Sequence, residues 1–254
     1  MVLIGDGMAD RPVDEIGGLT PLKKALTPNM DRLAQKGIIG NVRTIPKGFH
    51  PGSDVANLSI LGYNPSVYYT GRAPLEAASI GVKLNESDVA FRCNLVTLKF
   101  NNSDGSGIFM DDYSSGHIST EEARELIAAL NNELKNDEIV FYPGVSYRHL
   151  MVWKNGSVNV ECAPPHDIIG KEITEYLPKG RGDKFLQNLM KQSVGILEGH
   201  SINIKRKASG KKPANSIWLW GQGKKPVLPT YQEKYRSEER RVGKECRSRW
   251  SPYH

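Results

Sequence analysis

The chain contains 254 residues with a formal net charge of +6; 24% of the residues are charged and 39% are hydrophobic. These proportions are typical of a globular protein and exclude a wholly disordered chain. No stretch approaches the roughly 20 apolar residues that a membrane helix needs, and Asp6 interrupts the first apolar run before a secretory signal could form. We therefore predict a soluble, cytoplasmic protein with no membrane partner.

The positive charge is concentrated in the last residues of the sequence. Residues 236–254 hold six arginines and lysines against three glutamates, with almost no aliphatic residues and no usable periodicity. Such a segment contributes little to a core, so we predict that it is a foreign-looking basic tail outside the fold. For the rest of the chain no nucleic-acid partner is expected.

The three cysteines do not form a recognisable motif. Cys93, Cys162 and Cys246 lie far apart, are odd in number and never show a CxxC spacing. This pattern argues against a disulfide framework and against a cysteine-based zinc site. We expect free thiols in a reducing compartment.

The first 45 residues predict a strand, a helix and a second strand. Residues 2–4 are apolar and lead into Gly5-Asp6-Gly7, a pattern typical of a buried strand that ends at an aspartate. Thr27 followed by proline predicts the start of a helix, and Gly37 predicts its end. Residues 38–45 are expected to form the second strand.

The segment around Ser53 predicts a turn followed by a short helix, because apolar residues recur at positions 55, 58 and 61. Ser53 would lie at the helix N-terminus, where free N–H groups and the helix dipole favour a phosphate. The Asp6 carboxylate, flanked by two glycines, could hold a divalent cation. Together the two residues suggest a metal-assisted serine nucleophile that acts on a phosphoryl group.

From about residue 75 the pattern changes to a second α/β unit. Ser119 and Glu122 form a capping-box pattern before a helical stripe of apolar residues, and Asp183 begins another helix. The residues from Gly221 to Gly223 are expected to end the last strand. Strands are predicted at residues 89–98, 146–153, 158–162 and 217–220, and helices at 120–134 and 183–197.

Seven blocks of the sequence occur in the order found in one enzyme family. They are IGDGMADRP, PGSDVANLSILGYNPSVYYTGRAPLEAASIGV, FRCNLVTL, DDYSSGHIS, YRHLMVW, PPHDIIGK and ANSIWLWGQGKKP. Over roughly residues 1–235 the chain resembles the cofactor-independent phosphoglycerate mutases of the archaeal type, within the alkaline-phosphatase superfamily. This resemblance implies an α/β fold in which an incomplete alkaline-phosphatase-like sheet core, residues 1–75 and 206–235, carries an inserted smaller α/β domain, residues 76–205.

The resemblance implies an isomerase that interconverts 3-phosphoglycerate and 2-phosphoglycerate through a phosphoserine, in glycolysis and gluconeogenesis. Ser53 matches the nucleophile of the family. Asp6 matches a carboxylate that binds one of two divalent ions, Mn²⁺ or Mg²⁺, and Ser53 contacts the same ion. Family members bring further aspartate and histidine ligands in their second half, and these do not appear here. We therefore expect a C-terminally truncated chain with part of the ligand set and impaired activity.

The inserted domain is expected to handle phosphoglycerate, the small-molecule substrate. Arginine suits this task because its planar guanidinium binds carboxylates and phosphates in a bidentate manner. Arg72 and Arg92 could instead pair with a structural carboxylate such as Glu76. The candidate substrate-binding residues are His117, Arg148, His149, His166 and Asp167.

Two other functions stay open. A metal-dependent phosphatase of the same superfamily would transfer the phosphoryl group from serine to water. Alternatively, the chain is an inert fragment whose basic tail binds polyanions. The sequence predicts neither the oligomeric state nor which of the divalent metals is preferred.

Overall fold

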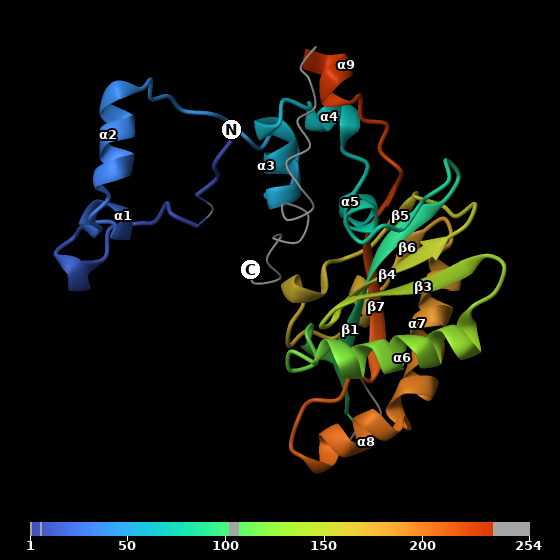
Figure 1. The fold of residues 1–254 in the computed structure, drawn as a ribbon. Coiled ribbons are helices and arrows are strands. Elements are labelled where there is room, and N and C mark those ends of the chain that lie inside the picture. Colours follow the sequence, from blue (N-terminus) through green and yellow to red (C-terminus); the bar gives the residue numbers. More distant parts are fainter. Residues whose placement is uncertain (1, 6, 102–106, 236–254) are drawn as a thin grey trace. The chain divides into compact units, whose positions relative to one another are not determined.

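The computed structural model describes residues 2–5, 7–101 and 107–235. The chain divides into two compact units, Met1–Arg43 and Thr44–His254. Figure 1 labels the helices and strands of both units. Asp6 and the tail 236–254 lie outside the described residues.

The first unit is helical in its described part. The prediction of a helix between Thr27 and Gly37 is confirmed, because α2 begins at Pro28 and Gly37 caps its C-terminus. The Thr27 side chain does not cap the backbone; its hydroxyl donates to Asp31 Oδ1 at 2.9 Å. The unit contains η1 (Asp14–Ile16), α1 (Pro21–Lys24) and α2 (Pro28–Lys36).

The two strands predicted in this unit are wrong. Residues 2–4 and 38–45 have no strand structure, and Leu3 and Ile39 are 89% and 77% exposed. A strand needs a neighbouring backbone for its ladder of hydrogen bonds, and no described strand pairs with either segment. The apolar residues of these segments favour burial, but no described strand pairs with the segments, so a strand does not form there.

The second unit is built on a five-stranded sheet, and every described strand pair is antiparallel. Strand β1 pairs with β4 along one edge and with β7 along the other, while β2 and β3 lie at the ends of the order β2-β1-β4-β3. A separate two-stranded sheet joins β5 and β6. The strands are β1 (Val89–Phe100), β2 (Ile108–Asp112), β3 (Ile139–Val145), β4 (Arg148–Trp153), β5 (Val160–Glu161), β6 (Lys179–Gly180) and β7 (Ser216–Lys224).

Most strand predictions for this unit are confirmed in position. β1 and β4 lie within or close to the predicted ranges 89–98 and 146–153, and β5 is shorter than predicted. The predicted end of β7 at Gly221 is wrong, since the strand continues to Lys224. The reason is that β1 offers ladder partners beyond that glycine, with Ala90 opposite Gly223 and Val89 opposite Lys224.

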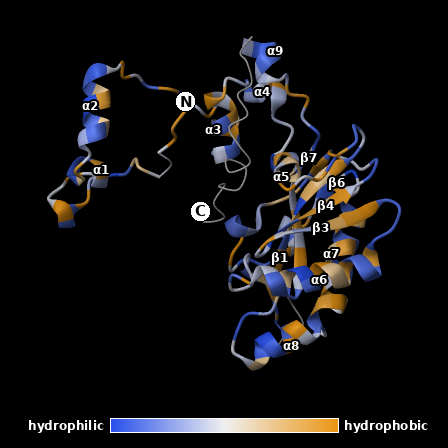
Figure 2. Cartoon of the chain, in the orientation of Figure 1, coloured by the Kyte–Doolittle hydropathy of each residue, from blue (hydrophilic) through white to orange (hydrophobic). Residues whose placement is uncertain are grey.

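Helices cover both faces of the sheet. Side chains alternate along β1, so the strand presents apolar residues to both faces. Phe91 and Cys93 belong to the main core with buried residues of α6 and α7, whereas Ala90 packs in a second cluster with Ala73 and Ala77 of α5. Figure 2 shows hydrophobic residues on β3 and β4 in this unit. Its helices are α3 (Ser53–Ile60), α4 (Pro65–Tyr68), α5 (Arg72–Ser79), α6 (Thr120–Leu134), η2 (Pro165–Asp167), η3 (Thr174–Tyr176), α7 (Asp183–Glu198), α8 (Ser201–Ala208) and α9 (Tyr231–Tyr235).

The predicted helix starts in the second unit are confirmed. Ser119 and Glu122 form the capping box of α6, with Glu122 N–H donating to Ser119 Oγ at 3.2 Å. Helix α7 begins at Asp183. Helix α8 was not predicted, since its basic residues hide the buried positions Ile202 and Arg206.

The mixed α/β class is confirmed, and every described strand pair is antiparallel. Strand β7, from the segment 206–235, pairs with β1, from the segment 76–205, so the two predicted segments share one sheet. The division into a core and an inserted domain stays a prediction. In the described part of the chain, no helix is both long enough and apolar enough to cross a membrane.

Candidate functional site

A pocket of about 760 Å³ opens beside the N-terminus of α3 in the second unit. Residues from four separate stretches line it, at 49–55, 69–72, 162–167 and 220–222. The pocket therefore depends on the tertiary fold rather than on one motif. Its polar side chains include those of His50, Asp54, Arg72, His166, Asp167 and Gln222.

Ser53 is the first residue of α3 and is exposed. Its neighbours Gly52 and Asp54 line the pocket, and its side chain makes no hydrogen bond to any described residue. Gly52 is the N-cap in an extended conformation and supplies no capping side chain. The first backbone N–H groups of α3 are thus available to an anion, which the helix dipole also favours.

Asp54 carries a negative charge at the same helix end and is held by Tyr69. The Tyr69 hydroxyl donates to Asp54 Oδ2 at 2.5 Å. Burial, together with this hydrogen bond, raises the pKa of Tyr69, so the hydroxyl stays protonated and keeps its role as donor. The carboxylate of Asp54 is therefore fixed in one orientation beside Ser53.

Two arginines share Glu76 next to the pocket, as the sequence suggested. Arg92 Nε lies 3.0 Å from Glu76 Oε2, and Arg72 Nε lies 3.4 Å from Glu76 Oε1. The side chain of Arg92 is only 5% exposed, and its guanidinium carbon lies 4.3 Å from the centroid of Trp220, which lines the pocket. Burial lowers the pKa of Arg92, and Glu76 opposes this effect.

His166 touches the same tryptophan from η2. Its ring centroid lies 5.3 Å from that of Trp220, and its Nε2 lies 3.6 Å from Asp167 Oδ1. Burial lowers the pKa of His166, and the nearby charges of Arg92 and Arg72 lower it further, against the effect of Asp167. The imidazole is therefore mainly neutral at pH 7.

Aromatic rings connect this pocket to two further candidates. The Tyr113 ring lies 6.1 Å from His166 and 5.5 Å from Tyr147, measured between centroids. Tyr147 in turn contacts His117 at 6.1 Å, and the guanidinium carbon of Arg148 lies 5.6 Å from its centroid. The structure thus joins His117, Arg148 and His166 in one chain of ring contacts that ends at the pocket.

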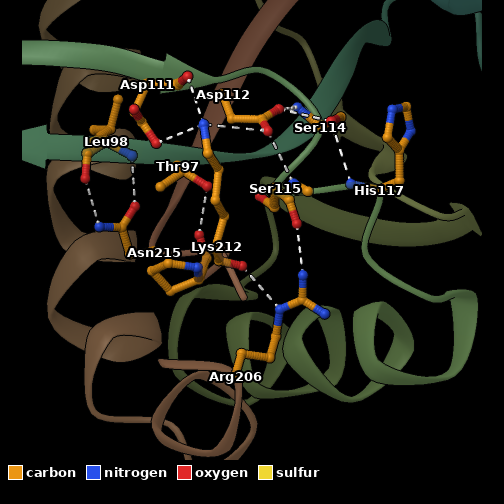
Figure 3. Close-up of polar contacts among 12 residues, drawn as sticks. Thr97, Leu98, Asp111, Asp112, Ser114, Ser115, His117, Arg206, Lys212 and Asn215 are labelled. Atoms are coloured by element: carbon orange, nitrogen blue, oxygen red, sulfur yellow. Dashed lines mark hydrogen bonds and ion pairs between the residues drawn. The ribbon is translucent and has the colours of Figure 1, made fainter. Parts of the chain in front are cut away.

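His117 lies at the end of an unusual turn between β2 and α6 (Figure 3). Ser115, Gly116 and His117 have φ angles of 51°, 61° and 50°, in the left-handed region. For the two residues with side chains this conformation costs on the order of 1 kcal/mol each. Asp112 supports the turn by accepting hydrogen bonds from Ser114 N–H at 2.7 Å and Gly116 N–H at 3.1 Å.

The same hydrogen bonds affect the ionisation of Asp112. Burial works against its charged form, but the bonds from Ser114 and Gly116 hold the pKa of the carboxyl below its usual value. Lys212 adds to this effect, with Nζ 3.6 Å from Asp112 Oδ2. The acceptor that supports the turn is therefore ionised at neutral pH.

The structure does not bring His149 together with the other candidates. His149 is 2% exposed and lies opposite Cys93 in the β1–β4 pair, on the face that packs against the main core. Neighbouring residues of a strand point to opposite faces, so Arg148 and His149 cannot serve the same pocket. His149 Nδ1 accepts a hydrogen bond from Gly144 N–H at 3.0 Å, and its Nε2 has no partner among the described residues.

The buried position of His149 makes the stability of the fold sensitive to acid. Burial lowers the pKa of His149 from 6.5 to about 3. Between these values the unfolded chain binds the proton more readily than the folded chain. The free energy of unfolding is therefore not reduced by His149 above pH 6.5, and it falls between pH 6.5 and pH 3 by up to about 1.4 kcal/mol per pH unit. We expect urea denaturation to show this slope, and the variant His149→Gln, which cannot titrate, to reduce it. An equal slope in both proteins would contradict this role.

The described residues do not fit a divalent metal ion. Among them, no group of three or more histidine, cysteine, aspartate or glutamate side chains is arranged to hold one. The pocket offers the carboxylates of Asp54 and Asp167, and Asp54 is already bonded to Tyr69. Hard divalent ions take about six oxygen ligands, so this pair is insufficient. The predicted ligand Asp6 lies outside the described residues.

Sequence reasoning missed the aromatic residues of the site. Tyr113 belongs to the block DDYSSGHIS, four residues before His117, and Tyr147 begins the block YRHLMVW, directly before Arg148. Trp220 is buried, yet it also lines the pocket. The available signal was that an aromatic residue lies one position before Arg148 and another lies four positions before His117.

The comparison with known proteins agrees with the family that the seven blocks suggested. The family model described as 2,3-bisphosphoglycerate-independent phosphoglycerate mutase matches residues 34–203, about two thirds of the chain. The chain belongs to this family. The match contains Ser53 and all the candidate substrate-binding residues up to Asp167.

Similar proteins carry the same description. The 2,3-bisphosphoglycerate-independent phosphoglycerate mutase of Methanosarcina barkeri is 57% identical to this chain. The 2,3-bisphosphoglycerate-independent phosphoglycerate mutase 1 of Methanocaldococcus jannaschii is 39% identical. Each match covers 92% of this chain and 57% of the relative. The structure of the PH0037 protein from Pyrococcus horikoshii matches with a TM-score of 0.67 and 30% identity over 91% of this chain and 53% of that one. The cofactor-independent phosphoglycerate mutase from Thermoplasma acidophilum matches with a TM-score of 0.52 and 29% sequence identity. This match covers 91% of this chain and 60% of that one. The chain spans a little over half the length of these relatives.

Proposed function

We propose that this chain carries the nucleophile and much of the substrate site of a cofactor-independent phosphoglycerate mutase, an isomerase that interconverts 3-phosphoglycerate and 2-phosphoglycerate. The observation that carries the proposal is the chain of contacts from His117 and Arg148 through Tyr147, Tyr113 and His166 to the pocket at α3. Family membership supports the reaction assigned to it. The substrate is then a small molecule with one phosphate and one carboxylate.

In the proposed reaction Ser53 is the phosphate carrier. Its Oγ forms a bond to phosphorus while the bond from phosphorus to the oxygen on carbon 3 breaks, and the serine proton passes to the released alkoxide. The 2-hydroxyl of the retained glycerate then attacks the phosphoserine, its proton passes to Ser53 Oγ, and 2-phosphoglycerate forms. The free N–H groups of α3 bind the transferring phosphoryl group.

The other candidates bind the part of the substrate that must not leave. Arg148 can bind a carboxylate or phosphate in a bidentate manner, and His117 contacts the same Tyr147 ring. His166 and Asp167 line the pocket itself, and their side chains lie 3.6 Å apart. The pocket lining contains one arginine, Arg72, and two aspartates, Asp54 and Asp167. A negatively charged phosphorylated ligand therefore also needs positive charge from outside the lining, such as that of Arg148.

The remaining assignments are part of the same proposal. We place the chain in the cytoplasm and assign an alkaline-phosphatase-like core to residues 1–75 and 206–235, with the inserted domain between them. Two divalent ions, Mn²⁺ or Mg²⁺, are the cofactors that the family suggests. The described residues do not fit such an ion, and the proposed transfer depends only on Ser53 and the N–H groups of α3.

Phosphorus NMR of the purified chain with 3-phosphoglycerate, with and without Mn²⁺, tests this function. We expect 2-phosphoglycerate to form without free phosphate, and 3-phosphoglycerate to bind at least about tenfold more tightly than glycerate, because the phosphate contributes most of the charge. Release of free phosphate as the main product would favour a phosphatase. Absence of both binding and conversion would show that the chain is inert.

A further inference from the structure

Arg206 is a buried cation that lies between three parts of the second unit. Its side chain is 4% exposed, although it belongs to the basic last turn of α8, between the exposed residues Lys205 and Lys207. Its Nη2 donates to the Ser115 carbonyl at 2.6 Å, its Nη1 to Glu122 Oε2 at 2.6 Å and its Nε to the Lys212 carbonyl at 3.0 Å. Figure 3 shows the bond from this guanidinium to the turn that carries His117.

The Ser115 carbonyl is the critical one of these acceptors. It belongs to the first residue of the left-handed turn 115–117, whose φ angles are unfavourable for serine and histidine. The Ser115 hydroxyl cannot stabilise the turn, since it is fully buried without a hydrogen-bond partner among the described residues. The N–H groups of Ser114 and Gly116 are held by Asp112, that of His117 by Ser114 Oγ at 3.3 Å, and the Ser115 carbonyl by Arg206.

The second bond of Arg206 fixes the other end of the segment. Glu122 Oε2 accepts from Arg206 and also from Ser119 N–H at 3.4 Å, in the capping box of α6. His117 therefore lies between two fixed residues. Ser115 is bound by Arg206 directly, and Ser119 is bound by Glu122, which itself accepts a hydrogen bond from Arg206. A planar fork with five donors can satisfy such a set of acceptors, whereas an ammonium group cannot do so in this geometry.

We propose that Arg206 is the positioning residue for His117: it holds the left-handed turn so that the imidazole stays against Tyr147, at the substrate side of the ring chain. This inference rests on the proposed function, in which His117 contacts phosphoglycerate. Arg206 itself does not touch the substrate in this scheme. It acts through the backbone, at a distance from the pocket.

The test compares the variant Arg206→Met with a matched control, Lys205→Met, which removes an exposed charge from the neighbouring position of α8. Histidine ring signals in NMR spectra of the full chain report the result, with His117 assigned from its loss in His117→Gln. We expect the His117 signal to move towards the value of a free histidine in Arg206→Met, because the Tyr147 contact is lost. The buried His149 signal serves as the internal measure of an intact fold and should stay in place.

A rescue variant separates positioning from general stability. Glycine adopts positive φ angles without steric cost, and Ser115→Gly removes no hydrogen bond of that side chain. Adding Ser115→Gly to Arg206→Met should therefore restore part of the His117 shift. Affinity for 3-phosphoglycerate should fall about tenfold or more in Arg206→Met, and part of it should return when Ser115→Gly is added. Lys205→Met should change neither measurement.

The outcomes are distinguishable from failure of the proposed function. An unmoved His117 signal in Arg206→Met, or no recovery with glycine at position 115, would overturn the positioning role even if phosphoglycerate binds the unaltered chain. If the unaltered chain binds no phosphoglycerate, the proposed function fails, while the His117 signals still decide the role of Arg206. Should Arg206→Met unfold, Arg206→Lys keeps the charge beside Glu122 and should displace His117 in a folded chain.

Discussion

Replacing Ser53 with alanine is expected to abolish phosphoryl transfer, with a loss of about a thousandfold or more, because it removes the hydroxyl that is proposed to accept the phosphoryl group. The fold should tolerate the change. Ser53 is exposed, its side chain makes no hydrogen bond to a described residue, and the N-cap of α3 is Gly52. We therefore expect the free energy of unfolding to change by less than about 0.5 kcal/mol. Incubation with labelled 3-phosphoglycerate should leave label on the unaltered chain but none on Ser53→Ala.

The matched control for this experiment lies on the same helix. Ser59→Ala removes a hydroxyl from the last turn of α3, away from its N-terminus. Labelling and turnover should remain those of the unaltered chain. Label retained by Ser53→Ala would mean that another residue carries the phosphoryl group, and the proposed nucleophile would be incorrect.

Replacing Arg92 with methionine is expected to destabilise the second unit by about 2–3 kcal/mol. Removing one partner of a fully buried ion pair costs about 3–5 kcal/mol. Here the cost is lower because Glu76 is 31% exposed and keeps Arg72 as a partner. The contact with the Trp220 ring is lost as well. The midpoint of urea denaturation measures the change, and the pKa of His166 should rise, since Arg92 helps to lower it.

Arg72→Met provides the comparison, because it removes the same charge from the same glutamate. Arg72 is 37% exposed and forms an ordinary (i, i+4) pair, so its loss should cost less than about 1 kcal/mol. Arg92→Lys should fall between the two, since it keeps the charge but loses the planar contact with Trp220. Equal destabilisation by Arg72→Met and Arg92→Met would show that burial of Arg92 contributes nothing.

The parts of the fold that sequence predicted well are those whose signals are local. The capping box at Ser119, the apolar stripe of α6 and the strand predicted at residues 89–98 all correspond to elements in the structure. The two strands expected in residues 2–45 failed because pairing depends on a distant backbone. The extension of β7 past Gly221 has the same origin, since β1 supplies its partners.

For the site, the family pattern predicts residues but not their orientation. Arg148 and His149 are adjacent in sequence and both fit a substrate role, yet the β4 pleat directs His149 into the core. The contacts through Tyr113 and Tyr147 bring together segments that are separated in the chain, so no local pattern could predict them. Arg206 looked like one more basic residue of a polar stretch, because its burial appears only once α8 packs against the turn.

Strand β1 supplies residues to both sides of the sheet at alternate positions. Phe91 and Cys93 belong to the main core, and Arg92 between them supports the pocket through Glu76 and Trp220. A breathing motion that separates β1 from its neighbours would thus dismantle the binding cavity and the hydrophobic interior in one event. Any molecule that occupies the cavity should accordingly slow amide hydrogen exchange throughout the sheet, and not merely in the loops around it.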